Sequence, residues 1–182
     1  NGSLNPALGL TGIRLCLAEP VMFRTQMRAI LRAAAHGPVR MMWPMITSIS
    51  EVRQCLIHLD TAQRQLTERG ETFGPVSIGC MIEIPSAAMT VGSILKLVDF
   101  VSIGTNDLIQ YLLSVDRGDD SVSHLYQPGH PAVLKTLQHI IRTANRMEKG
   151  VSICGEMAGD TVFTRLLLGM GLRRFSMNPN NL

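Results

Sequence analysis

The chain has 182 residues, of which 46% are hydrophobic, 17% charged and 4% aromatic, and its mean hydropathy is +0.18. These values exclude a disordered or collagen-like protein and suffice for one domain with an aliphatic core. The formal net charge of +3 comes from scattered basic residues, and no apolar run reaches the ~20 residues of a membrane span. We therefore expect neither a nucleic-acid partner nor membrane insertion.

Helical patterns recur along the chain. Ile13–Leu17 fits either a strand or a short helix. A helix is predicted from Pro20 to just before Gly37, and the spacing of Ser48 and Glu51 is typical of a capping box that begins the next one. Further helices are predicted from Pro85, over 107–115, from Pro131 to just before Gly150, and over 161–170.

Between these helical patterns lie five short and mostly apolar runs. Such runs are typical of strands that are buried on both faces. The five predicted strands are Val39–Ile46, Val76–Glu83, Asp99–Gly104, Val151–Cys154 and Arg173–Met177.

Alternating strands and helices predict an α/β fold with a parallel sheet and right-handed crossovers. A doubly wound sheet and a (β/α)₈ TIM barrel both satisfy this pattern. A complete barrel needs eight strands and ~250 residues, so the five predicted strands would form only part of one. We expect residues 1–182 to form a single domain and interpret Asn1–Ser3 as a remnant of cloning.

Parallel α/β folds bind ligands in the loops that follow the carboxyl ends of the strands. Few polar groups occupy these positions here. They are Glu83, the turn Gly104–Asp107, the run Cys154–Glu156 and Asn178. Two carboxylates, a thiol and a turn of small residues are thus predicted to share one rim of the sheet.

Glu83 and Asp107 end neighbouring predicted strands, so their carboxylates are candidate ligands for a hard divalent cation. Magnesium commonly takes one or two protein carboxylates and completes its octahedron with water and substrate oxygens. In the alternative interpretation, Glu83 caps the helix that begins at Pro85 and Asp107 only complements a helix dipole.

The turn before Asp107 leads directly into a helix, so its backbone N–H groups can face an anion. Arg117 lies one helix beyond and can act as a bidentate clamp for phosphate or carboxylate. The alternative is an exposed arginine paired with Asp116.

Cys154 follows a predicted strand and precedes Gly155. A thiol is mostly protonated at neutral pH and can donate its proton to a basic carbon, although free cysteines are more often inert core residues. The other three cysteines fall inside predicted helices or strands, and no CxxC motif is present. We expect reduced thiols and a cytoplasmic protein.

Several motifs together resemble Enzyme I of the bacterial phosphoenolpyruvate:sugar phosphotransferase system. In chain order they cover nearly the whole sequence and are therefore more specific than any one of them. They are NPALG (5–9), QMRAILR (26–32), MIEIPSA (81–87), SIGTNDL (102–108), DRG (116–118), SHLYQP (123–128), CGEMAGD (154–160) and LGMGLRRFSM (168–177). SHLYQP favours this family over pyruvate phosphate dikinase, which shares the barrel.

The resemblance implies the phosphoenolpyruvate-binding TIM barrel, which also dimerises in this family. Glu83 and Asp107 would ligate Mg²⁺, Asn106 and Arg117 would bind phosphoenolpyruvate, and Cys154 would protonate the enolate to release pyruvate. The phosphoryl acceptor would be a histidine on a separate phosphocarrier domain or an HPr-like protein, and none of the five local histidines is a candidate.

Two departures from the family pattern matter. Thr11 stands where the family has a phosphate-binding arginine, and the strands that carry its other substrate arginines are absent from this sequence. We therefore expect the isolated segment to be inactive. The alternatives are a non-catalytic phosphoenolpyruvate-binding or dimerisation module and a related phosphoenolpyruvate-utilising enzyme such as a dikinase.

Overall fold

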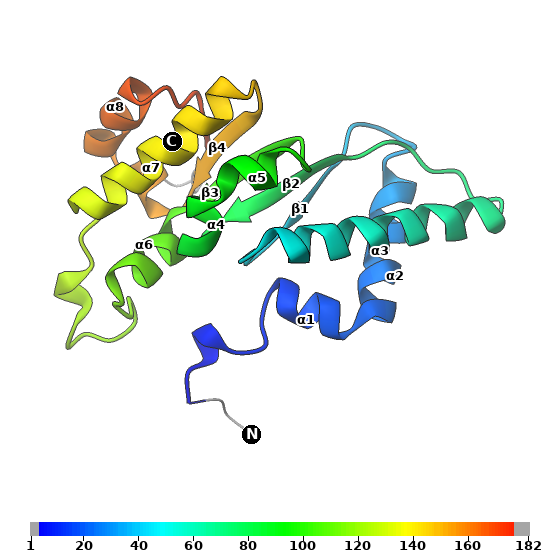
Figure 1. Ribbon diagram of the computed structural model, residues 1–182, viewed down its shortest axis with the longest axis horizontal. Coiled ribbons are helices and arrows are strands. Elements are labelled where there is room, and N and C mark those ends of the chain that lie inside the picture. Colours follow the sequence, from blue (N-terminus) through cyan, green and yellow to red (C-terminus); the bar gives the residue numbers. More distant parts are fainter. Residues whose placement is uncertain (1–3, 177–182) are drawn as a thin grey trace.

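A computed structural model describes residues 4–176 of the chain. Five parallel strands form one sheet in the sequential order β1-β2-β3-β4-β5 (Figure 1). Their bounds are β1 (Arg40–Trp43), β2 (Ser77–Ile82), β3 (Phe100–Gly104), β4 (Gly150–Cys154) and β5 (Arg174–Ser176). The predicted parallel α/β architecture is confirmed, and each observed strand lies within one residue of, or inside, its predicted run.

The helices connect the strands in the crossover arrangement that parallel pairing requires. Their bounds are α1 (Ile13–Ala18), α2 (Pro20–Ala33), α3 (Ile49–Glu68), α4 (Pro85–Met89), α5 (Val91–Leu95), α6 (Thr105–Leu113), α7 (Pro131–Arg146) and α8 (Thr161–Gly169). Three 3₁₀ turns were not predicted: η1 (Pro6–Leu8), η2 (Ser123–Leu125) and η3 (Glu156–Gly159). No helix among the described residues is long and apolar enough to cross a membrane.

Local sequence signals set most helix ends. The Ser48 hydroxyl accepts a hydrogen bond from the Glu51 N–H, and the Glu51 carboxylate accepts one from the Ser48 N–H, so the predicted capping box is present. The ambiguous segment at the chain's beginning is the helix α1. Two predictions were imprecise: the helix from Pro85 is interrupted at Thr90, and α6 begins two residues before Asp107.

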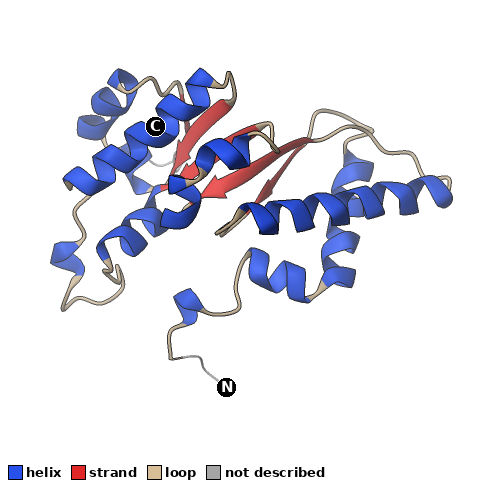
Figure 2. Cartoon of the chain, in the orientation of Figure 1, coloured by secondary structure: helices blue, strands red, loops and turns tan. Residues whose placement is uncertain are grey.

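The prediction that all strands are buried on both faces was wrong for β1 and β4. Side chains alternate between the two faces of a strand, and the burial of β1 and β4 alternates accordingly. Only β3 is buried throughout. The cause is that the described helices cover one face of the sheet, which leaves the other face partly open (Figure 2).

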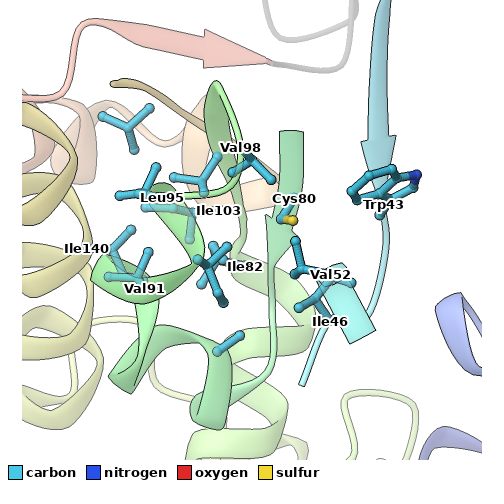
Figure 3. Close-up of a cluster of buried hydrophobic side chains, with 14 of the residues drawn as sticks. Trp43, Ile46, Val52, Cys80, Ile82, Val91, Leu95, Val98, Ile103 and Ile140 are labelled. Carbon is cyan, nitrogen blue, oxygen red and sulfur yellow. The ribbon is translucent and has the colours of Figure 1, made fainter. Parts of the chain in front are cut away.

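The main core lies between the sheet and the helices (Figure 3). Its fully buried members include Cys80 and Ile82 from β2, Ile103 from β3, and Val91 and Leu95 from α5. This packing fixes the central strands rigidly, so the residues on their opposite face and at their carboxyl ends are held in defined positions.

Candidate functional site

Glu83 follows β2 directly and is 7% exposed. Its Oε1 accepts a hydrogen bond of 2.7 Å from the Met45 N–H in the loop after β1. The helix α4 is preceded by Ile84 and has no side-chain cap, so the alternative role of Glu83 as a helix cap is wrong. Glu83 is thus a buried carboxylate held by a backbone N–H group, in a place where an unpaired charge is costly.

Asp107 lies in the first turn of α6 and its carboxyl group reaches that of Glu83. Burial raises the pKa of Glu83 to about 7, with the negative charge of Asp107 adding to the rise and the Met45 N–H opposing it. The two predicted carboxylates thus converge on one place, as a shared cation would require.

Gly104, the last residue of β3, lies between Glu83, which follows β2, and Cys154, the last residue of β4. Gly104 pairs with Cys154 in the β3–β4 register. A Cβ atom at Gly104 would lie 2.8 Å from Glu83 Oε2 and 3.0 Å from Glu83 Cβ. The absent side chain therefore leaves space between a carboxylate and a thiol on the face of the sheet that the described helices do not cover, which we call the inner face.

The Cys154 thiol is half-buried and lies among sulfur and oxygen atoms. Its Sγ accepts from the Ser102 hydroxyl at 3.7 Å and donates to the Ile103 carbonyl at 3.4 Å. Burial raises the pKa of Cys154, the bond from Ser102 lowers it, and the charges of Glu83 and Asp107 raise it further. The thiol is consequently kept in its protonated form, as a proton donor requires.

Asn106 links the turn after β3 to the turn after β4. Its Oδ1 accepts a hydrogen bond of 3.1 Å from the Glu156 N–H. Gly155 permits this approach, since it has φ +112° and a Cβ there would lie 2.5 Å from Thr105 Oγ1. The Asn106 amide group, which makes no other hydrogen bond among residues 4–176, remains a donor for a ligand.

Arg117 lines a cleft of about 420 Å³ together with Gly118, Ser123, Tyr126 and Glu156. The alternative ion pair with Asp116 is not formed in the described part of the chain, where Asp116 instead accepts from the Gly118 N–H at 2.8 Å. The Tyr126 hydroxyl donates to the Asn106 carbonyl at 3.4 Å, so this cleft adjoins the turn that carries Asp107.

A second pocket, of about 320 Å³, opens beside Glu83 and was not predicted from the sequence. Thr11 and Arg14 form one wall, and Met45, Ile84 and Tyr111 contribute from the loops and helix after β1, β2 and β3. No local sequence motif indicates this pocket. One of its walls is the N-terminal segment, which packs against residues that are far away in the chain.

The contact between the Glu83 and Asp107 carboxyl groups suits a magnesium ion, and the spacing of the two residues in the sequence did not show this contact. Glu83 and Asp107 offer hard oxygen ligands in contact with each other, and the described part of the chain brings no third acidic, histidine or thiol group to make an all-protein cage. That donor set suits a cation which keeps water and substrate oxygens in its shell. Asn178 lies outside the described residues.

Comparison with curated proteins gives close relatives along almost the entire sequence. The pattern of the family described as "PEP-utilising enzyme, PEP-binding domain" matches residues 1–182. A protein from Cupriavidus necator named phosphoenolpyruvate-protein phosphotransferase is 56% identical over 99% of this chain, and one from Bacillus subtilis with the same name is 44% identical over 98%. The chain spans about a third of the length of these relatives, 31% and 32% respectively.

Solved structures share the fold at low sequence identity. A citrate lyase from Burkholderia xenovorans matches 87% of this chain and 50% of its own, with 21% identity and a TM-score of 0.65. An HpcH/HpaI aldolase from Desulfitobacterium hafniense gives a TM-score of 0.54 at 19% identity, with 83% of this chain and 62% of that chain covered. These neighbours are TIM-barrel-like, which favours a partial barrel over the doubly wound sheet. The chain belongs to the family described as "PEP-utilising enzyme, PEP-binding domain".

Proposed function

We propose that this chain is the part of a phosphoenolpyruvate–protein phosphotransferase that binds phosphoenolpyruvate and releases pyruvate. The phosphoryl group would pass to a histidine on a separate domain or an HPr-like protein, as the first step of sugar uptake by the phosphotransferase system. One observation carries the proposal: the buried Glu83 carboxylate faces Cys154 across the empty side of Gly104, with Asp107 alongside. The names of the relatives from Cupriavidus necator and Bacillus subtilis support the same activity.

The reaction breaks the bond between phosphorus and the enol oxygen, whose electron pair stays on that oxygen. Arg117 and the Asn106 amide would bind the substrate's anionic oxygens and orient it. Cys154 would then donate its thiol proton to C3 of the enolate, which becomes the methyl group of pyruvate. The raised pKa of Cys154 keeps this proton in place until the carbon becomes basic.

Glu83 and Asp107 would hold Mg²⁺, which supplies positive charge beside the phosphoryl and enolate oxygens when bound. The Met45 N–H fixes one oxygen of Glu83, so the carboxylate is oriented before any ligand arrives. Gly104 keeps the intervening space free.

The remaining proposals concern the whole protein. We propose residues 1–182 as one domain of an enzyme that dimerises through its barrel and works in the cytoplasm. The cysteines among the described residues are all unpaired, which supports a reducing compartment. A non-catalytic binding module is the main competitor, since Thr11 offers no charge where the family has an arginine.

A chimera tests the proposal. Residues 1–182 replace the corresponding third of the Cupriavidus necator relative, which supplies the remaining parts of such an enzyme. We expect the chimera to transfer phosphate from phosphoenolpyruvate to its acceptor histidine when Mg²⁺ is added. We expect Glu83→Gln and Asp107→Asn each to lower this rate by at least about 10³-fold, since both remove a charge from the transition-state environment.

The matched control is Asp60→Asn, which removes an exposed carboxylate on α3 that pairs with Arg64. It should leave the rate unchanged. A chimera that folds and binds phosphoenolpyruvate but transfers no phosphate would establish the non-catalytic binding module, and a requirement for ATP would establish a dikinase. Full activity in Glu83→Gln would refute the role assigned to that carboxylate.

A further inference from the structure

The pocket beside Glu83 contains one charged side chain, that of Arg14. The pocket has a volume of about 320 Å³, within the range of small-ligand sites. Its other walls are apolar or carry hydroxyl groups, notably Thr11, Thr47 and Tyr111. A positively charged group in such a surrounding predicts an anionic ligand.

Arg14 is exposed, and two hydrogen bonds to backbone carbonyls orient its guanidinium group. Its Nη1 donates to the Leu8 carbonyl at 2.9 Å and to the Gly9 carbonyl at 3.4 Å. The segment that supplies these carbonyls is itself anchored, because the Tyr111 hydroxyl donates to the Ala7 carbonyl. The remaining N–H groups of the guanidinium make no hydrogen bond among residues 4–176, so they stay available to a ligand.

Two contacts bring this wall against the acidic pair. Gly12 has φ +54° and lies directly on Met45, since a Cβ at Gly12 would come within 2.6 Å of Met45 Cγ. Met45 in turn donates its N–H to Glu83. The segment that carries Arg14 is thus packed against the residue that orients the carboxylate.

Arg14 nevertheless does not pair with either carboxylate. The two ion pairs in the described part of the chain are Arg32–Glu71 and Arg64–Asp60. Burial raises the pKa of Tyr111, the charges of Asp107 and Glu83 raise it further, and the charge of Arg14 lowers it, so all three charged groups lie near this one hydroxyl. An oriented cation that lies near two carboxylates without pairing with them remains able to bind an anionic ligand.

We propose that Arg14 binds the phosphoryl group of phosphoenolpyruvate in this pocket and supplies the positive charge that Thr11 does not. The inference rests on the proposed function and extends it by naming the phosphoryl ligand. Thr11 lines the same pocket and can offer only a hydroxyl. Arg14 is the one cation that the described residues place there.

The test is a double-mutant cycle in the chimera. Arg14→Gln should raise the KM for phosphoenolpyruvate by about 10- to 100-fold, the effect of one charge-assisted hydrogen bond, with little change in kcat. Thr11→Arg should lower the KM. In the Thr11→Arg background, Arg14→Gln should cost less than about 3-fold, because the new arginine occupies the same pocket.

A binding measurement separates phosphoryl recognition from mere support of the loop. Calorimetry with Mg²⁺ compares phosphoglycolate, which carries a phosphoryl group, with oxalate, which does not. Arg14→Gln should weaken phosphoglycolate by about 10-fold or more and leave oxalate unchanged. Arg53→Gln removes an exposed arginine from α3 as the charge-matched control and should affect neither ligand.

Equal weakening of both ligands by Arg14→Gln would show that Arg14 only supports the loop, and would overturn the proposal. The proposal would also be overturned if Arg14→Gln raised the KM for phosphoenolpyruvate by the same factor with Thr11 as in the Thr11→Arg variant. If the chimera transfers no phosphate at all, the proposed function fails, while the two binding constants still decide whether Arg14 recognises a phosphoryl group.

Discussion

On β2, which lies between β1 and β3 in the sheet, the residues that face the helices differ from those that face the opposite side. Ile78, Cys80 and Ile82 pack against the helices and are at most 7% exposed. The alternate positions hold Gly79 and Met81, and Glu83 follows them on the same side. The apolar face holds the strand in place, and the other face is free to carry groups that packing alone would not tolerate.

The same residue type illustrates the difference between the two faces. Cys80 lies on the apolar face, fully buried, where burial raises the pKa of its thiol to about 12. Cys154 lies on the inner face, half-buried, and contacts the Ser102 hydroxyl. A thiol becomes useful for proton transfer when a ligand can reach it, which burial in the core prevents.

Substituting each of the two cysteines tests this difference between the two faces most directly. In the chimera, we expect Cys154→Ala to slow pyruvate formation by about 10²- to 10⁴-fold, the range for loss of a general acid. Transfer of the phosphoryl group to the acceptor should slow less, since it precedes protonation of the carbon. Single-turnover measurements of phosphohistidine and of pyruvate distinguish the two steps.

The control is Cys80→Ala, which removes a thiol from the apolar face. It should lower stability through a small cavity but leave the ratio of the two rates unchanged. Equal loss of both steps in Cys154→Ala would refute its role as the proton donor.

Substitution of Gly104 tests whether phosphoryl transfer depends on the space on the inner face. In Gly104→Ala, the new Cβ would lie 2.8 Å from Glu83 Oε2 and 3.2 Å from Met81 Sδ, so the carboxylate must move. A misplaced group at a reacting centre can lower a rate by about 10²-fold. We therefore expect Gly104→Ala to slow phosphoryl transfer by about that factor.

A glycine on the helical side of the sheet is the control for Gly104. In α5, a Cβ at Gly92 would meet Thr143 Cγ2 at 3.5 Å, an ordinary contact. Gly92→Ala should therefore keep full activity and raise stability by about 0.5–1 kcal/mol, because alanine favours the helix. An active Gly104→Ala chimera would show that Glu83 needs no clear space beside it.

The pH dependence of pyruvate formation tests whether the Cys154 thiol is the proton donor. Burial disfavours the Cys154 thiolate and raises the pKa of the thiol, so the proton donor remains loaded throughout the neutral range. We expect no loss of the donor, and hence no decline of the rate, until the solution is more alkaline than the ordinary pKa of a thiol; beyond that the rate should fall about tenfold per pH unit. In Cys154→Ser the rate should be lower and lack this decline; a decline that persists there would identify another donor.

Much of the fold follows from local sequence patterns. The apolar runs predicted five parallel strands, and Ser48 with Glu51 predicted the start of α3, because these signals act within a few residues. The interruption at Thr90 and the open faces of β1 and β4 were not predicted. They depend on which elements cover them, and a single run of residues does not contain that information.

The site was predictable to a similar extent and for a similar reason. That Glu83, Asp107 and Cys154 lie together could be predicted, because the strand ends of a parallel sheet share one rim; their roles in a site are our proposal. The Met45 N–H that orients Glu83 and the pocket around Arg14 were missed. Both depend on contacts between segments far apart in the chain, such as Tyr111 with Ala7, which no local spacing encodes.

The smallest predicted effect concerns the edge of the site, where the inner face meets the Arg117 cleft. The Tyr126 hydroxyl donates to the Asn106 carbonyl at 3.4 Å, a long bond that steadies the turn carrying Asn106 and Asp107. Removing it in Tyr126→Phe should cost about 0.5–1.5 kcal/mol, which corresponds to roughly a 2- to 10-fold rise in KM with kcat nearly unchanged.

His124 provides the control for that substitution, since it is exposed on η2, two residues before Tyr126. His124→Ala should leave both kinetic constants as they are. A fall in kcat rather than a rise in KM for Tyr126→Phe would mean that the tyrosine acts on the reacting atoms themselves. An unchanged KM would mean that the turn after β3 is held by Glu156 and Gly155 alone, because the Glu156 N–H already fixes the Asn106 side chain.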